Sequence, residues 1–199
     1  MPFIRTTPPT AAEGAAREMY DKVQAEQGSI PNWAHAFSLR PAVRAGWVSL
    51  ITSIRPNLST RRYELVTLAA ATALRSTYCS LAHGRVLASQ VFDDAAMHEI
   101  VSGDASAVLE PAEVAMMEFA RNVVLAADRI TERDVATLRS HGLSDAEIFD
   151  IAATAAARCF FSKLLDALGV EADAGFQSMD AELRAALTVG RPVADAMSS

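Results

Sequence analysis

Helix-start and helix-stop residues recur along the whole chain, and no segment shows the sustained alternation of apolar and polar residues that marks a β-strand. Between these signals the apolar residues are spaced three and four positions apart, as they are on one face of a helix. Aromatic residues make up only 7% of the chain and alanine is abundant, a composition that suits closely packed helices. The sequence therefore predicts an all-α fold, a compact helical bundle.

Proline, glycine and capping residues divide the chain into a series of expected helices. Gly28 ends the first of them, Pro41 stands at a permitted first-turn position, and Ser144 opens a capping box. Ser76 is a good N-cap residue, so it is expected to break what would otherwise be one long helix. The expected helices cover residues 11–27, 41–54, 60–75, 76–90, 94–101, 111–127, 131–141, 145–168 and 172–188, with a short turn or helix at 31–35.

We expect a single domain spanning residues 1–199, because a chain of this length can bury a substantial core. Prolines in residues 1–10 forbid a regular helix there, so this segment is expected to be an extended N-terminal arm. Residues 190–199 are expected to form a frayed C-terminal tail.

Charge and composition bear on the partners and the compartment. The net charge is −6 and no basic run occurs, which argues against nucleic acid as a partner. No uninterrupted apolar span is long enough to cross a membrane. Two cysteines are too few for a disulfide framework and fit a reducing compartment, so we expect a cytoplasmic protein. Because 51% of the residues are apolar, we also expect surface to be hidden between the subunits of a homo-oligomer.

The segment from Glu64 to His83 combines residue types that suit nucleophilic chemistry. Cys79 and His83 are four positions apart, so they share one face if the segment is helical. An imidazole beside a thiol favours the thiolate, and a carboxylate such as Glu64 can orient the imidazole from its other nitrogen. If Ser76 caps the helix, Cys79 becomes its third residue and meets the positive end of the helix dipole.

Two other interpretations compete with this one. Cys79 and His83 alone could be a buried small residue beside a satisfied histidine, and it is the carboxylate at Glu64 that favours a site. The pair also supplies only two metal ligands, where zinc needs three or four, so we expect no metal and no cofactor. The bulky aromatic side chains of the N-terminal region are interpreted as core packing: Trp33, Phe37 and Trp47.

The spacing of Glu64, Cys79 and His83 resembles a signature of the carboxymuconolactone decarboxylase superfamily. In its alkylhydroperoxidase D-like branch the pattern is Glu, then Cys-x-x-Cys, then His four residues later. Tyr78 precedes the cysteine here, and Ser76 stands where the first cysteine of the pair is expected. The wider resemblance, to the peroxidase-related members of that branch, runs from Ile30-Pro31-Asn32 to Leu168-Gly169-Val170.

The resemblance implies a helical bundle of the alkylhydroperoxidase D-like type and a peroxiredoxin-like, antioxidant activity that reduces hydroperoxides. It makes Cys79 the activated thiol, His83 its base and Glu64 the relay carboxylate, with Ser76 and Tyr78 as secondary site residues. With no resolving cysteine at Ser76, the oxidised thiol needs a small external thiol or a partner protein. Cys159, in an apolar helical stretch, is expected to be a buried, inert thiol. The family also forms dimers, trimers and hexamers.

A second class of function stays open at this point. The decarboxylase branch of the superfamily resembles this fold and does not depend on the cysteine pair. The chain could therefore be a non-redox enzyme acting on a small carboxylated substrate, or a protein that binds a small ligand on the same scaffold.

Overall fold

The computed structural model describes residues 2–102 and 104–195, and within these ranges it contains helices and no β-strand. The prediction of an all-α fold is confirmed. The α-helices are α1 (Gly14–Gln27), α2 (Asn32–Phe37), α3 (Pro41–Ile54), α4 (Thr60–Ala73), α5 (Thr77–Gln90), α6 (Asp94–Ser102), α7 (Pro111–Ala126), α8 (Glu132–Ser140), α9 (Asp145–Ala167) and α10 (Ala181–Leu187). Short 3-10 helices lie at Pro9–Ala11, Arg55–Asn57, Ala105–Ala107, Ala127–Arg129 and Ala174–Ser178.

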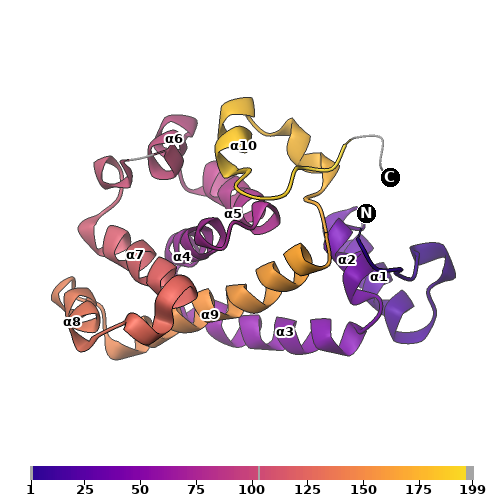
Figure 1. The fold of residues 1–199 in the computed structure, drawn as a ribbon, viewed down its shortest axis with the longest axis horizontal. Helices are drawn as coiled ribbons and strands as arrows, with labels where there is room; N and C mark the ends of the chain where they lie inside the picture. The colour runs from indigo at the N-terminus through magenta and orange to yellow at the C-terminus, as the bar shows by residue number, and fades with distance from the viewer. Residues whose placement is uncertain (1, 103, 196–199) are drawn as a thin grey trace.

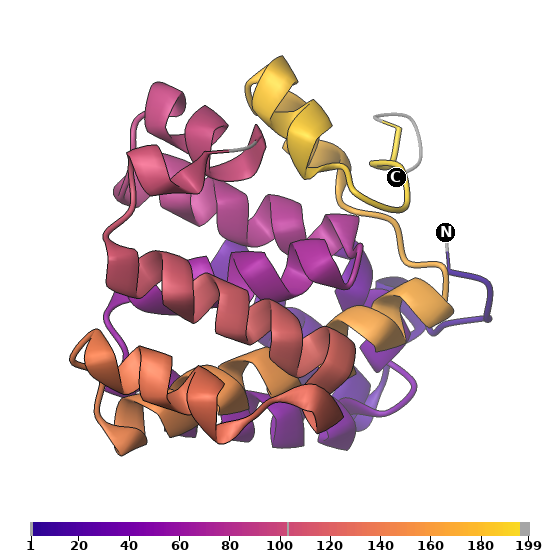
Figure 2. The same cartoon turned by 60° about the vertical axis from the view of Figure 1, so that its left-hand side comes forward.

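Helix α4 lies at the centre of the bundle, packed against α5, α7 and α9 (Figures 1 and 2). Every residue from Tyr63 to Ala71 is buried, so this helix meets protein on all sides. Three consecutive alanines, Ala69 to Ala71, offer little side-chain bulk and let its neighbours approach closely. The candidate carboxylate Glu64 is carried by this most enclosed element.

Capping residues set the helix boundaries as the sequence predicts. The Ser59 hydroxyl accepts a hydrogen bond from the Arg62 backbone N–H at the start of α4. Ser144 and Glu147 form the predicted capping box of α9. Gly28 takes the left-handed conformation after α1, with φ of 74°.

The predicted break between α4 and α5 is also present. Arg75 adopts φ of 57°, a conformation that reverses the chain between the two helices. Ser76 is the N-cap residue of α5, which makes Cys79 the third residue of that helix. The Ser76 hydroxyl does not cap the helix, however, because it makes no hydrogen bond to a first-turn N–H.

The prediction of one helix over residues 172–188 is wrong. A 3-10 helix covers Ala174–Ser178, and α10 begins only at Ala181. The reason is Asp180, whose side chain accepts a hydrogen bond from the Leu183 N–H at 2.8 Å and so starts a separate helix.

The expectation of a frayed tail fails for residues 190–195. The Gly190 N–H donates to the Thr77 hydroxyl at 2.8 Å, and the Ala194 N–H donates to the Ala172 carbonyl at 2.9 Å. These contacts hold the segment against the start of α5 and against the residues that follow α9. Residues 196–199 of the expected tail lie outside the described residues. At the other end of the chain, the expected extended arm is interrupted by the 3-10 helix at Pro9–Ala11.

Helix α3 is apolar, yet only Ile54 of its residues is buried. Val43 and Leu50 are 43% and 47% exposed. An apolar helix face without a covering element is typical of a surface that meets another protein. Assembly of the chain into a homo-oligomer stays a prediction. Within the described ranges, no helix has both the length and the apolar character needed to span a bilayer.

Gly190 offers a test of the contact between the C-terminal segment and α5. A Cβ at this position would lie 2.0 Å from the carbonyl oxygen of Arg75, and backbone cannot yield as a side-chain end can. Gly190→Ala should lower the free energy of unfolding by about 1–3 kcal/mol, as overpacking does. Gly175→Ala is the matched control, because a Cβ there meets nothing within 4 Å. Equal denaturation midpoints for the two variants would contradict the contact.

Candidate functional site

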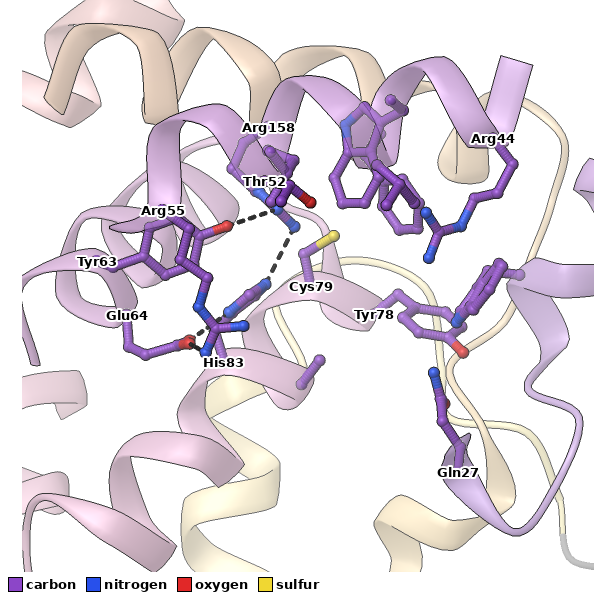
Figure 3. A pocket seen from close by; sticks show the side chains of 16 residues that line it. Gln27, Arg44, Thr52, Arg55, Tyr63, Glu64, Tyr78, Cys79, His83 and Arg158 are labelled. Atoms are coloured by element: carbon purple, nitrogen blue, oxygen red, sulfur yellow. Dashed lines mark hydrogen bonds and ion pairs between the residues drawn. The ribbon is translucent and has the colours of Figure 1, made fainter. Parts of the chain in front are cut away.

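One pocket collects the predicted catalytic residues. It is a cavity of about 290 Å³ between α3, α4, α5 and α9, and Glu64, Cys79 and His83 all line it (Figure 3). Glu64 comes from the first turns of α4, whereas Cys79 and His83 come from the first two turns of α5. The antiparallel arrangement of α4 and α5 brings the carboxylate back toward the imidazole.

Glu64 and His83 form a direct hydrogen bond, with 2.5 Å between Glu64 Oε2 and His83 Nδ1. A carboxylate can only accept, so Nδ1 carries the proton and Nε2 presents its lone pair. That lone pair is occupied, because Arg158 Nη1 donates to Nε2 at 3.0 Å. Both ring nitrogens of His83 are therefore engaged, and the imidazole is held in one tautomer and orientation.

The environment lowers the pKa of His83 below its usual 6.5. Burial disfavours the charged ring most, and the neighbouring Arg158 guanidinium acts in the same direction. The hydrogen bond to Glu64 and its negative charge oppose them, and Arg55 adds a smaller lowering effect. His83 is consequently a neutral imidazole at pH 7.

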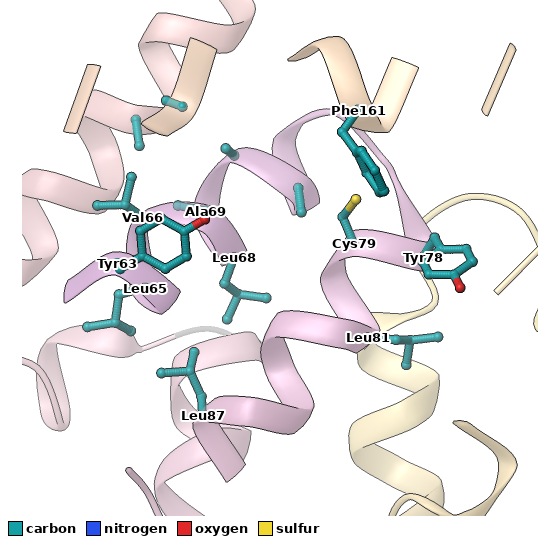
Figure 4. Packing of buried hydrophobic residues seen from close by; sticks show 14 of the residues in the cluster. Tyr63, Leu65, Val66, Leu68, Ala69, Tyr78, Cys79, Leu81, Leu87 and Phe161 are labelled. Carbon is teal, nitrogen blue, oxygen red and sulfur yellow. The ribbon is translucent and has the colours of Figure 1, made fainter. Parts of the chain in front are cut away.

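Cys79 is buried, at 2% exposed, and packs beside Tyr78 and Phe161 at the edge of the core (Figure 4). No hydrogen bond joins its thiol to His83, although both residues are among those described and share one face of α5. Figure 3 shows the thiol pointing into the pocket and away from the imidazole ring. The sequence thus places the two side chains in one pocket correctly, whereas the direct hydrogen bond between them is absent.

Positive charge in the pocket can therefore stabilise the thiolate form of Cys79 directly, whereas the base His83 is not bonded to the thiol. As the third residue of α5, Cys79 faces the positive end of a helix dipole. The guanidinium of Arg158 lines the same pocket. His83 can take the thiol proton only when Nε2 exchanges its partner from Arg158 to sulfur.

Ser76 and Tyr78, the secondary site residues, differ in their position. Ser76 is fully buried and is not part of the pocket wall. Its hydroxyl lies toward Asp166, whose pKa is raised by burial and lowered in part by that hydroxyl. The Tyr78 ring lines the pocket, while its hydroxyl donates to the carboxylate of Asp173. Burial raises the pKa of Tyr78 well above 10.0, so it stays a neutral phenol.

Cys159 is half-buried on α9, not buried as the sequence analysis expects. Cys79 and Cys159 are both free thiols, and Cys159 does not line the pocket. Its neighbour Arg158 does, so the two consecutive residues of α9 face different surroundings.

Sequence reasoning missed the arginines of the pocket. Arg158 is 3% exposed and donates to His83 and, at 3.4 Å, to the Tyr63 hydroxyl. Arg55 Nη2 lies 3.6 Å from Glu64 Oε1 at the rim. A signal for Arg158 was present, since it is the single charge in the apolar run from Ile151 to Ser162. An isolated charge on a helix that is otherwise apolar needs a buried partner.

The aromatic residues also divide in a way the sequence did not predict. Phe37 is buried and stacks on Phe161, as core packing requires. Trp33 and Trp47, in contrast, line the pocket. The interpretation as core packing holds for Trp33, which is 7% exposed within the core, and Trp47 packs partly buried against that core. Among residues 2–102 and 104–195, no group of three or more His, Cys, Asp and Glu side chains is arranged to hold a metal ion.

Residues 41–122 match the model of the carboxymuconolactone decarboxylase family. This segment runs from α3 into α7 and contains Glu64, Cys79 and His83. The matched segment, 82 of the 199 residues, is similar to this family. The match ends well before α9, so Arg158 lies outside the part of the chain that the family model covers. No curated protein matches the chain in sequence.

Solved structures share the fold of this chain over nearly its whole length. A peroxidase-related protein of Ralstonia eutropha JMP134, described as an alkylhydroperoxidase AhpD core, aligns with a TM-score of 0.76 and 22% identity, over 96% of this chain and 98% of its own. A peroxidase-related protein of Silicibacter sp. TM1040 aligns with a TM-score of 0.74 and 20% identity, over 89% and 97% of the two chains. The prediction of a helical bundle of the alkylhydroperoxidase D-like type is confirmed.

A third similar structure carries a different name. The debrominase Bmp8, in complex with 2,3,4-tribromopyrrole, aligns with a TM-score of 0.72 and 16% identity, over 94% of this chain and 97% of its own. At this level of identity the likeness establishes the fold, and function has to be argued from the site.

The state of His83 can be measured directly. Because its pKa is lowered, the imidazole ¹⁵N resonances should show a neutral ring with a protonated Nδ1 at pH 7 and a titration midpoint below 6.5. As pH falls, the unfolded chain then binds this proton before the folded one does, so His83 reduces the free energy of unfolding below about pH 6.5. The resonances are assigned by their loss in His83→Gln. A midpoint at or above 6.5 would contradict the neutral ring.

Proposed function

We propose that the chain is a thiol-dependent hydroperoxide reductase in which Cys79 is the nucleophile. The observation that supports this most is the pocket itself, where a thiol at the first turn of a helix lies beside a Glu64–His83 relay and a buried guanidinium. The helix start and the guanidinium lower the free energy of ionising the thiol, and the Glu64–His83 pair supplies a proton acceptor and donor. The similarity in fold to peroxidase-related proteins agrees with this proposal.

The first step oxidises the thiol. The Cys79 sulfur attacks the outer peroxide oxygen, the O–O bond breaks, and its electron pair leaves on the alkoxide. The thiol proton passes to His83 Nε2 and then to the alkoxide, so Cys–SH and ROOH become Cys–SOH and ROH. Sulfur gives two electrons and the peroxide takes them. Glu64 stabilises the imidazolium that exists between the two proton transfers.

Arg158 has to change partner during this step. In the resting site it donates to His83 Nε2, the same atom that accepts the thiol proton. When the guanidinium turns toward the sulfur or toward the bound peroxide, the lone pair becomes free. Arg158 therefore acts as a positioning residue that keeps His83 neutral and oriented until substrate is present.

Regeneration uses an external thiol. One thiol R′SH condenses with Cys–SOH to give a mixed disulfide and water, and a second R′SH releases Cys–SH and R′SSR′. Ser76 cannot take part, since a hydroxyl forms no disulfide. Cys159 is not part of the pocket wall, which favours a small thiol or a partner protein as the resolving group.

Matched cysteine variants test the nucleophile. Cys79→Ser should abolish thiol-dependent consumption of cumene hydroperoxide, because no sulfur remains in the pocket. Cys159→Ser should retain it, since that thiol lies elsewhere. Peroxide consumption with a small thiol, together with mass spectrometry of the oxidised cysteine, provides the measurement. If wild type and Cys79→Ser consume peroxide equally with every thiol tried, the non-redox alternative replaces this proposal.

Ser76→Cys should convert the site into a dithiol. Positions 76 and 79 are the N-cap and third residue of α5, the arrangement in which redox Cys-x-x-Cys pairs close a disulfide. Mild oxidation of this variant should give an intramolecular disulfide between the introduced thiol and Cys79, seen by mass spectrometry after proteolysis, and faster turnover with a dithiol donor. Ser89→Cys, an exposed position on the same helix, is the control and should form no such bond. A folded Ser76→Cys protein without the disulfide would show that the motif is misplaced.

A further inference from the structure

The pocket carries an excess of positive charge that the proposed thiol chemistry does not use. Three guanidinium groups, those of Arg44, Arg55 and Arg158, line it together with one carboxylate, Glu64. That carboxylate is already bound to His83 and paired with Arg55. The chain as a whole has a net charge of −6, so this concentration of positive charge is local to the pocket.

Arg44 is the least compensated of the three. Arg44 is half-buried, and within the described residues its guanidinium makes no hydrogen bond and no ion pair, with Nε and Nη1 buried and without a partner. Its guanidinium lies over the rings of Trp33 and Trp47, with 4.5 and 5.1 Å to the ring centroids. The rings fix its position but accept none of its N–H groups. Buried N–H groups without an acceptor are costly, and a bound anion would satisfy them.

Arg158 adds a second charge on the facing wall. Its Nη1 and Nη2 atoms are bound to His83 and Tyr63, both neutral acceptors, and its Nε atom is buried without a partner. Burial lowers the pKa of Arg44 most, the negative charge of Glu26 acts against this, and repulsion from the Arg158 guanidinium lowers the pKa further. In the view of Figure 3, the Cys79 thiol lies between the two groups.

We propose that Arg44 and Arg158 form an anion-binding subsite for the carboxylate of a small aromatic acid, which places the rest of that molecule over Cys79. As a statement about substrate, this inference rests on the proposed function, and it defines the hydroperoxide as one that carries a carboxylate. Guanidinium and carboxylate match in geometry, and such charge-assisted hydrogen bonds are about twice as strong as neutral ones.

The pocket lining between the arginines favours a ligand with a flat apolar ring. Trp47 and Phe161 lie 4.4 Å apart between ring centroids, and Trp33 and Tyr63 complete an aromatic lining. A cavity of about 290 Å³ admits a single-ring ligand and is too small for a long acyl chain. The ring can stack on this lining while its carboxylate reaches the guanidiniums.

Binding of benzoate tests the subsite without any redox step. The chain has two tryptophans, Trp33 and Trp47, and both line the pocket, so their fluorescence reports its occupation. Reduced wild-type protein is titrated with benzoate and with benzamide, a neutral molecule of the same shape. We expect benzoate to bind about tenfold or more tightly than benzamide. Equal affinities would overturn the subsite, as would the absence of benzoate binding up to its solubility limit.

Arginine variants test which guanidinium groups bind the carboxylate. Arg44→Gln and Arg158→Gln should each weaken benzoate binding about tenfold or more and leave benzamide unaffected. Arg129→Gln removes the same charge from an exposed position outside the pocket and should change neither affinity. Circular dichroism establishes that each variant is folded. An equal loss of benzoate affinity in Arg44→Gln and Arg129→Gln would show an effect of net charge alone and would overturn the subsite.

Peroxide kinetics separate this inference from the proposed function. Cumene hydroperoxide is compared with its para-carboxylated form, which differs only by the anion. The subsite predicts a KM at least tenfold lower for the carboxylated peroxide, with similar kcat, and loss of that preference in Arg44→Gln. Selective benzoate binding with no turnover of either peroxide would refute the peroxidase and support the subsite. Turnover of both with equal KM would refute the subsite and support the peroxidase.

Discussion

The buried carboxylate of Glu64 is the constraint on which the site depends. Its side chain is only 3% exposed, on a helix that meets protein on every side, so its charge must be matched from within the bundle. Arg55 offsets that charge, and the neutral His83 ring donates a hydrogen bond to the carboxylate. Removing either partner leaves the buried carboxylate less compensated, which is far more costly than replacing the whole group by apolar residues. The position of α5 against α4 is fixed by this requirement as much as by apolar packing.

The positions of Glu64, Cys79 and His83 could be predicted because local rules determine them. The chain reversal at Arg75 sets where α5 begins, the start of α5 sets which residue is third, and the antiparallel return brings Glu64 to His83. The family match to residues 41–122 covers the same segment. Helix boundaries governed by proline, glycine and capping residues were likewise predictable, since each depends on a few neighbouring residues.

Features that depend on distant parts of the chain could not be predicted in this way. Arg158 reaches His83 across 75 positions of sequence, and it does so only because α9 packs against α4. Spacing along α5 places Cys79 and His83 on one face but does not set the side-chain rotamer that turns the thiol away. The composition of the tail predicts fraying because its backbone partners, Thr77 and Ala172, lie elsewhere in the sequence.

The contacts of the C-terminal segment have a consequence for the order in which the site is completed during synthesis. The hydroxyls on both sides of Cys79 in the sequence are tied to late residues, Thr77 to the N–H of Gly190 and Ser80 to the carbonyl of Leu187. A nascent chain emerges from the ribosome N-terminus first, so α5 is made long before these partners exist. The helix that carries the thiol therefore gains these contacts only after about a hundred further residues have been made.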